Sequence, residues 1–356
     1  MRIFLDNIIF SLQKAGGISG AWAVLIRELL AMPELDIRFI EREDALQNIF
    51  RNQLAIPSSL IINPRRLPLR LDRYLPVRLE GDVPFVFHSS YYRICSSPTA
   101  LNVVTLHDFI YEEARVHSPL ARRVHTFQKK HALYHAAAIA AVSHATARKL
   151  TNRLALSGKV IYNPPVCTPV STSMKRNGFA LYVGSRVSYK NFRQAAEAAA
   201  IAGVPMTIAG APLDNEESAL LASLAHKSDF RIIENPDNNM LSRLYSSAMC
   251  LIYPSSHEGF GIPIVEAMTH RCPVITGPCD ACIETGGGAT LVTEDYSPEA
   301  LARALVRIRM NPGLREDLAN RGFEASRHFD ASEMAHAYIS LYQAIADNVK
   351  QFPDFC

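Results

Sequence analysis

The stretch that decides the fold is Tyr253-Pro-Ser-Ser-His-Glu-Gly-Phe-Gly-Ile-Pro-Ile-Val-Glu-Ala-Met-Thr-His-Arg-Cys-Pro-Val-Ile275. An apolar run leads into its Gly-Phe-Gly turn, and a helix is predicted just after Gly261, because Pro263 suits a first helical turn. The glycines leave room for a ligand near the main chain. Glu258 and Glu266 flank the turn, and the free amides of the helix start favour an anion. The stretch therefore predicts a site that holds a sugar and a phosphate together.

Short apolar runs alternate with helical segments on both sides of this stretch. Strands are predicted at 2–5, 37–40, 85–88, 103–106, 139–142, 160–162, 179–183, 205–209, 230–233, 249–253 and 273–276. Helices are predicted at 21–31, 118–135, 145–152, 191–202, 216–225, 240–248, 263–269 and 297–309. This alternation indicates parallel sheets covered by helices on both faces, and the continuously apolar strands fit such burial.

The chain is long enough for two such domains. Its 356 residues exceed the usual size of one domain. The segment 163–173 is rich in proline and small polar residues, so we expect a linker near 164–175. It would join an α/β domain at 1–165 to another at 175–330. Because ligands of open α/β sheets bind beyond the carboxyl ends of the strands, we expect the site in a cleft between the domains.

Composition excludes several classes of protein. Charged residues are 20% and hydrophobic residues 48% of the chain, which argues against disorder. The net charge of +3 and the lack of a recognised motif argue against nucleic-acid binding. We expect no transmembrane helix, because no apolar run is long enough to span a bilayer. We also expect no signal peptide, because the apolar stretch at the N-terminus is short and is followed at once by the acidic residue Asp6. The seven scattered cysteines fit a reducing compartment, which favours a cytoplasmic location.

Two cations follow the predicted strand 179–183. Arg186 and Lys190 lie in the loop Val-Gly-Ser-Arg-Val-Ser-Tyr-Lys-Asn, which leads into a helix. Such a loop is a natural phosphate site, where arginine offers a fork and lysine a point charge. The alternative is a pair of solvated loop cations. The neighbouring pattern around Glu258 favours the diphosphate interpretation.

The motif Glu-Gly-Phe-Gly-Ile-Pro-Ile-Val-Glu-Ala-Met, with seven residues between its glutamates, resembles the signature of the retaining glycosyltransferases of family 4 (group 1). The resemblance extends along most of the chain and implies the GT-B architecture, two Rossmann-like doubly wound domains facing a cleft. It also implies that the N-terminal domain is the acceptor side and the C-terminal domain binds the nucleotide sugar. The last helix, 331–350, would cross back to the first domain.

The family resemblance also implies roles for individual residues. Glu258, His107, Arg186 and Lys190 would be catalytic. Three of these residues, Arg186, Lys190 and Glu258, would also bind the donor. The other donor-binding residues would be Gly16, Gly17, Gly259, Phe260, Gly261 and Glu266. Glu266 would bind the ribose hydroxyls of the nucleotide. His107 would contact the donor sugar, although a histidine bonded within its own domain explains the residue equally well. Ser143 is interpreted first as a helix cap.

We expect no cofactor and no metal, because the chain has no Asp-x-Asp motif to hold one. Arg186, Lys190 and helix amides would balance the diphosphate and stabilise the leaving charge. The resemblance implies retention at the anomeric carbon, with the departing phosphate as base. The expected reaction moves a hexose, on family frequency mannose from GDP-mannose, to a glycan or lipid-linked acceptor in surface polysaccharide or lipopolysaccharide synthesis. Open alternatives are a nucleotide-sugar epimerase, a phosphorylase and a non-catalytic sugar-nucleotide-binding subunit.

Two segments of the N-terminal half, 65–78 and 115–135, are basic and carry leucine and tyrosine between their cations. This pattern suits an anionic membrane surface or a lipid-diphosphate acceptor. An ordinary solvated face explains it equally well. The prediction is therefore a cytoplasmic enzyme with two candidate segments for peripheral contact with the inner face of a membrane.

Overall fold

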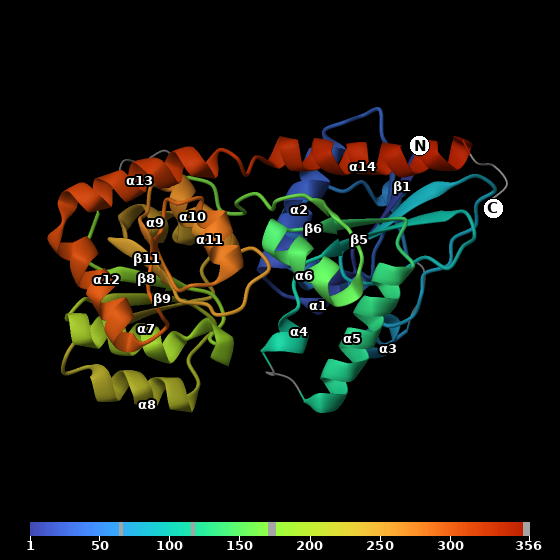
Figure 1. The fold of residues 1–356 in the computed structure, drawn as a ribbon. Helices are drawn as coiled ribbons and strands as arrows, with labels where there is room; N and C mark the ends of the chain where they lie inside the picture. Colours follow the sequence, from blue (N-terminus) through green and yellow to red (C-terminus); the bar gives the residue numbers. More distant parts are fainter. Residues whose placement is uncertain (64–66, 115–117, 170–175, 352–356) are drawn as a thin grey trace. The chain divides into compact units, whose positions relative to one another are not determined.

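The computed structural model describes residues 1–63, 67–114, 118–169 and 176–351. The chain divides into two compact units. The N-terminal unit contains the described residues of Met1–Glu112, His117–Pro164 and Asp330–Cys356, and the C-terminal unit contains those of Pro165–Phe329 and Glu113–Val116. Each unit is built around its own parallel sheet with helices packed on it (Figure 1).

Among the described residues, the sheet of the N-terminal unit has seven strands in the order β3-β2-β1-β4-β5-β6-β7, with every neighbouring pair parallel. The central strands β1 and β4 are buried almost throughout, as a sheet covered on both faces requires. The strand bounds are β1 Arg2–Asp6, β2 Asp36–Ile40, β3 Ile61–Ile62, β4 Phe85–Ser89, β5 Ala100–Leu106, β6 Ala138–Ala141 and β7 Lys159–Val160.

The helices of this part of the chain connect these strands. They are α1 Ile8–Leu12, α2 Gly17–Leu30, α3 Leu69–Asp72, α4 Ile110–Glu113, α5 Pro119–Tyr134 and α6 His144–Leu154, with 3-10 turns η1 Glu43–Gln47, η2 Arg51–Gln53 and η3 Ser58–Leu60. Ser143 is the N-cap of α6, and its Oγ accepts a hydrogen bond from the Thr146 amide at 3.0 Å. The predicted capping role of Ser143 is therefore confirmed.

The last helix, α14 (Ala331–Gln351), packs in the N-terminal unit against α2, β4 and β5 (Figure 1). Two buried tyrosines fix it there. The hydroxyl of Tyr342 lies 2.6 Å from Nδ1 of His88, and the hydroxyl of Tyr338 lies 2.9 Å from Oγ1 of Thr105. The C-terminal end of the sequence thus contributes to the core of the first unit.

The C-terminal unit has a sheet of six described strands in the order β10-β9-β8-β11-β12-β13, again all parallel. Alanine-rich α7 and α12 pack closely together on it. The strands are β8 Ala180–Val183, β9 Met206–Gly210, β10 Phe230–Glu234, β11 Cys250–Tyr253, β12 Val274–Thr276 and β13 Leu291–Val292. The helices are η4 Ser188–Lys190, α7 Phe192–Ala202, α8 Asn215–Leu224, α9 Asn238–Ser247, α10 Ile262–Thr269, α11 Asp280–Gly286, α12 Pro298–Met310 and α13 Pro312–Ser326.

The predicted fold class is confirmed, and the differences concern short or weakly patterned elements. The two-residue strands β3 and β13 are too short to show a period in the sequence. Helix α13 buries only Leu318, Gly322 and Ser326 among its described residues, so it has little apolar stripe to detect. Helix α2 begins at Gly17, four residues before its predicted start, because two glycines in its first turn weaken the helical signal.

Candidate functional site

The loop between β11 and α10 carries the Gly-Phe-Gly turn. Gly261 is the N-cap of α10 with φ of 105°, a left-handed conformation that favours glycine. A Cβ at this position would also lie 3.1 Å from Cδ1 of Ile264. Pro263 stands in the first turn, as predicted. The loop therefore leaves the carboxyl end of β11 and presents a helix N-terminus there, the place where open α/β sheets bind ligands.

Glu258, Tyr253 and Lys190 form one cluster at this loop. Lys190 follows β8 and Glu258 follows β11, and these two strands are neighbours in the sheet. Lys190 donates to the Glu258 carboxylate and, at 2.8 Å, to the hydroxyl oxygen of Tyr253. Tyr253 in turn donates to the same Glu258 oxygen at 2.6 Å. Burial raises the Tyr253 pKa well above its usual range, which keeps its hydroxyl proton available for this bond.

Arg186 lies in the same β8 loop but has different partners. Its Nε is 2.8 Å from a carboxylate oxygen of Glu217 on α8, and its Nη2 donates to the Pro212 carbonyl at 2.6 Å. Its guanidinium carbon stands 5.7 Å from the centre of the Phe192 ring, and 5% of the side chain is exposed. The two predicted diphosphate cations are thus each held by a carboxylate, Lys190 by Glu258 and Arg186 by Glu217.

Glu266 lies one turn into α10 and is buried. One carboxylate oxygen accepts a hydrogen bond from the Cys167 amide at 3.1 Å, and the other accepts from the Tyr245 hydroxyl at 2.9 Å. Burial raises the pKa of Glu266 to about 7, and hydrogen bonds from Tyr245 and from the backbone at Cys167 and Val166 offset part of the rise. The carboxylate therefore anchors the chain just after Pro165, a contact between residues 99 positions apart that the sequence did not reveal.

The central residue of the Gly-Phe-Gly turn, Phe260, belongs to the core of the C-terminal unit. The Phe260 side chain is buried and packs edge-on against Phe329 with ring centres 5.4 Å apart. Its carbonyl accepts a hydrogen bond from Thr285 at 2.8 Å. Phe260 therefore shapes the turn through its ring, and any contribution to a ligand has to come from the main chain of the turn.

His107, Gly16 and Gly17 belong to the N-terminal unit. His107 follows β5, and its Nε2 lies 3.4 Å from the Ser90 carbonyl oxygen. Burial lowers the pKa of His107 to about 4, so its imidazole is neutral at pH 7. Gly16 is the N-cap of α2, which begins at Gly17. The structure groups these residues in one unit and Arg186, Lys190, Glu258 and Glu266 in the other, so a shared cleft stays a prediction.

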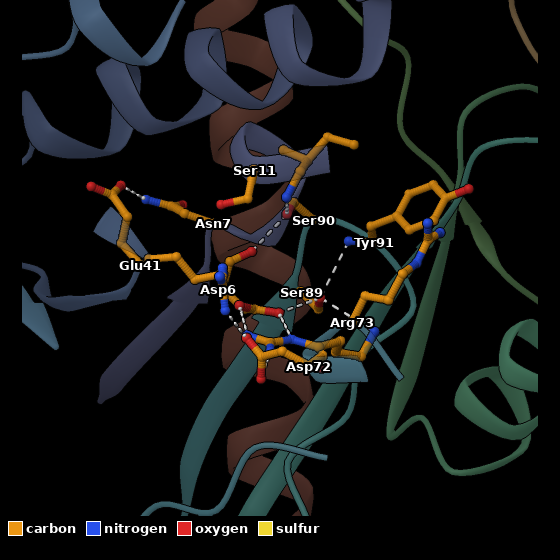
Figure 2. Close-up of polar contacts among 12 residues, drawn as sticks. Asp6, Asn7, Ser11, Glu41, Asp72, Arg73, Ser89, Ser90 and Tyr91 are labelled. Carbon is orange, nitrogen blue, oxygen red and sulfur yellow. Dashed lines mark hydrogen bonds and ion pairs between the residues drawn. The ribbon is translucent and has the colours of Figure 1, made fainter. Parts of the chain in front are cut away.

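A buried ion-pair network also lies at the carboxyl ends of β1 and β4 (Figure 2). Asp6 is fully buried and accepts from Nε of Arg93 at 2.9 Å and from the Ser89 hydroxyl at 2.7 Å. Arg93 also contacts Asp72 at 3.2 Å. Sequence reasoning missed this network, although Asp6 and Ser89 each stand at the polar end of an apolar strand. That shared position was the available signal.

The described residues contain no group of three or more histidine, cysteine, aspartate or glutamate side chains arranged to hold a metal ion. Within the same residues, none of the helices combines the length and apolar character that crossing a bilayer requires. Of the two basic segments predicted from the sequence, residues 65–66 and 115–117 lie outside the described residues, and contact of either segment with a membrane stays a prediction.

The fold places the chain among proteins with two parallel-sheet α/β domains of the GT-B type. Sucrose-phosphate synthase from Thermosynechococcus elongatus superimposes with a TM-score of 0.73 at 18% identity, over 97% of this chain and 99% of that one. The family model of glycosyl transferases group 1 matches residues 169–325. The chain therefore contains a group 1 glycosyltransferase domain at residues 169–325, within its C-terminal unit. The narrower assignment to family 4 stays a prediction.

Two curated relatives add detail about similar proteins. O-antigen chain mannosyltransferase B of Escherichia coli is 25% identical over 319 residues, which cover 83% of this chain and 81% of the relative. The GDP-mannose:cellobiosyl-diphosphopolyprenol alpha-mannosyltransferase of Komagataeibacter xylinus is 26% identical over 122 residues, 33% of this chain and 31% of that protein. The second match thus spans about a third of the relative.

Proposed function

We propose that this glycosyltransferase is a retaining, metal-independent mannosyltransferase that uses GDP-mannose and a lipid-linked glycan acceptor in the synthesis of O-antigen or a similar surface polysaccharide. The observation that carries the proposal is the Lys190–Tyr253–Glu258 cluster beside the N-terminus of α10. The names of the two mannosyltransferase relatives support the choice of sugar and of a lipid-linked acceptor.

In the proposed reaction, the donor diphosphate binds at the loops after β8 and β11. Its oxygens compete with Glu258 for Lys190 and with Glu217 for Arg186, because a diphosphate carries more charge than either carboxylate. Charge that builds on the leaving phosphate is then stabilised by these cations and by the amides at the start of α10. Glu258, released from Lys190, is free to accept hydrogen bonds from hydroxyls of the transferred sugar.

The proposed ribose contact of Glu266 requires a change at that residue. Both of its oxygens already accept a hydrogen bond, and the residue is 6% exposed. The backbone at Val166 is a third hydrogen-bonding partner of this carboxylate, so its two oxygens, with about four lone pairs in all, can accept one further ribose hydroxyl. For the ribose to reach Glu266, the chain at Cys167 would have to move away from the carboxylate, or the ribose hydroxyl and the Cys167 amide would have to bond to the same carboxylate oxygen.

The acceptor attacks from the side of the leaving group in this proposal, and the departing phosphate takes its proton. Glu258 is not proposed as a covalent nucleophile, since Tyr253 still donates to its carboxylate after Lys190 has turned to the diphosphate and the remaining lone pairs accept sugar hydroxyls. We further propose that His107 contacts the donor sugar as a neutral hydrogen-bonding group, consistent with its lowered pKa. Retention predicts an α-mannoside from α-linked GDP-mannose, which proton NMR of the product identifies.

The test is a panel of GDP-, UDP-, ADP- and TDP-sugars, measured by thermal shift and then by transfer to a polyprenyl-diphosphate glycan. GDP-mannose at a hundred times its Kd should stabilise the protein by about 2.7 kcal/mol. Lys190→Met should abolish the shift, whereas Lys227→Met, an exposed lysine of the same unit, should leave it unchanged. Absence of a shift with every nucleotide sugar would overturn the proposal, and a β-linked product would overturn retention.

A further inference from the structure

The two ring nitrogens of His107 have different surroundings. His107 directly follows β5, at the carboxyl end of the N-terminal sheet. Its Nε2 lies 3.4 Å from the Ser90 carbonyl oxygen. Its Nδ1 has no hydrogen-bond partner within the described residues and is open to solvent. One nitrogen is therefore used inside the N-terminal unit, and the other is left for a ligand.

The contact with Ser90 decides which nitrogen of His107 carries the proton. A carbonyl oxygen can only accept a hydrogen bond, so Nε2 has to be the donor. The neutral imidazole has a single N–H, and His107 is neutral at pH 7 because burial and the nearby charge of Lys129 lower its pKa to about 4. Nδ1 is therefore a pure acceptor, and a hydroxyl that bonds to it has to donate its proton.

Ser90 itself is held by the polar end of β1 (Figure 2). Its amide and its Oγ both donate to the Asp6 carbonyl oxygen, at 3.0 and 2.7 Å. Its Oγ also accepts a hydrogen bond from the Ile9 amide at 3.0 Å. Three hydrogen bonds thus fix this residue, and the carbonyl that meets Nε2 of His107 has a defined position.

The Asp6 carboxylate closes the rest of this loop on β1. Arg93 donates from Nε and Nη2 to the two oxygens of Asp6, a bidentate pair in which 3% and 0% of the side chains are exposed. The Ser89 hydroxyl donates to Asp6 and accepts from the Tyr91 and Arg93 amides at 3.2 and 3.4 Å. The loop 89–93 is therefore attached to β1 at both of its ends.

Inside this loop, Tyr92 has a φ of 48°. A bulky residue is strained in this left-handed region, and such strain persists only where the surroundings hold it. The Tyr92 hydroxyl accepts a hydrogen bond from the His107 amide at 3.3 Å. Tyr92 thus holds the main chain of His107, while Ser90 holds its ring.

We propose that Asp6, Arg93 and Ser90 are positioning residues, which keep His107 in its Nε2–H tautomer and so make Nδ1 a selective acceptor for one hydroxyl of the donor sugar. This role deepens the function proposed above and rests on it for the sugar, whereas the tautomer and its cause do not depend on a donor. A sugar with fluorine in place of that hydroxyl cannot donate to Nδ1. The site would reject it, because a polar group built to pair with the hydroxyl is left unpaired.

Two variants loosen this arrangement by different routes. Ser90→Ala removes the Oγ that joins the loop to β1 and keeps the carbonyl that meets Nε2. Asp6→Asn/Arg93→Gln replaces the buried ion pair by two amides, so neither partner is left as a charge without its counterion. The matched control is Arg2→Gln, which breaks the exposed Arg2–Asp36 pair at the opposite end of β1.

The first measurement is NMR of the whole protein with nitrogen-15 in its 12 histidines, without any donor. Correlation of ring protons with ring nitrogens separates protonated from unprotonated nitrogens, and His107→Leu identifies the signals of His107. Wild type and Arg2→Gln should show a protonated Nε2 and an unprotonated Nδ1 at pH 7. The two loosened variants should show a mixture of both tautomers.

The second measurement is calorimetry with GDP-mannose and with analogues in which fluorine replaces one sugar hydroxyl at a time. One analogue should bind wild type about five- to tenfold more weakly than GDP-mannose, the effect of one lost hydrogen bond. His107→Leu has no acceptor, so it should bind this analogue and GDP-mannose equally well. The loosened variants should discriminate less than wild type, and Arg2→Gln should discriminate as wild type does.

A protonated Nδ1 in wild type would overturn the positioning role, as would wild-type signals in both loosened variants. Equal binding of every fluorinated analogue and GDP-mannose by wild type would overturn the selective acceptor. Failure of every nucleotide sugar to bind, with the tautomers as expected, would refute the proposed function and leave the positioning role standing.

Discussion

Replacement of Glu266 by glutamine tests the electrostatics of the site most directly. The side chains have nearly the same shape, and the glutamine oxygen can still accept from the Cys167 amide while its NH₂ donates to Tyr245. The substitution therefore keeps the packing and removes only the titrating carboxyl. Any difference in pH dependence between the two proteins then reports on this group.

The magnitude follows from the pKa of Glu266, which burial raises from 4.5 to about 7. The folded state therefore binds the proton more tightly than the unfolded state. The stabilisation from this proton is fully present below pH 4.5 and is lost as the pH rises through 7. A shift of this size, at about 1.4 kcal/mol per pH unit, is worth roughly 3 kcal/mol.

The assay is urea unfolding at pH values from 4.5 to 8.5, followed by circular dichroism. The free energy of unfolding of Glu266→Gln minus that of wild type should rise by roughly 3 kcal/mol across this range. Tyr245 and Cys167 do not produce this difference, because burial raises their pKa values above this pH range. Burial lowers the pKa of His270, but both proteins contain this histidine, so its contribution cancels in the difference. The single tryptophan, Trp22, lies in the N-terminal unit, so its fluorescence separately reports the unit without Glu266.

Two results would refute this reasoning. The first is a constant difference between the two proteins from pH 4.5 to 8.5, which would mean that Glu266 has the same pKa folded and unfolded. The second is a difference that falls with pH, which would mean that the hydrogen bonds from Cys167 and Tyr245 outweigh the cost of burial.

Three further predictions concern the same loop. Tyr253→Phe removes the hydroxyl that bonds to both Lys190 and Glu258. Because hydrogen bonds to charged groups contribute about 1.5–3 kcal/mol, kcat/KM should fall about ten- to a hundredfold in the transfer assay. Unchanged kinetics would exclude a positioning role for Tyr253. Gly261→Ala should lower the free energy of unfolding in urea by about 1–2 kcal/mol, because alanine is strained at the positive φ of this position. Gly178→Ala should leave the free energy of unfolding unchanged, because the space around its Cβ position is open. Equal effects of the two substitutions would contradict this reasoning. Dialysis against EDTA should leave transfer unchanged, and a loss restored by Mg²⁺ or Mn²⁺ would disprove metal independence.

Strands and helices could be predicted from the sequence wherever their hydrophobic pattern or their turn residues formed a sufficiently long local signal. Strand β11 and helix α10 follow from an apolar run, two glycines and a proline, all of which act locally on the backbone. The seven-residue spacing of Glu258 and Glu266 also identified the loop. The sequence did not reveal their partners, because Tyr253 was interpreted only as the end of a strand and Cys167 only as part of a linker.

By itself, then, the sequence determined two parallel α/β sheets and the position of the glycine turn, and the motif around that turn carried the resemblance to glycosyltransferases. The sheets and the turn depend on periodicity and local backbone preference, which short segments carry. Only the tertiary structure decided that Lys190 pairs with Glu258, that Arg186 pairs with Glu217, and that Glu266 is buried against Cys167. Partner choice and burial depend on which distant segments the packing brings within about 3 Å, and that distance sets the strength of a charge interaction and the pKa of a carboxyl.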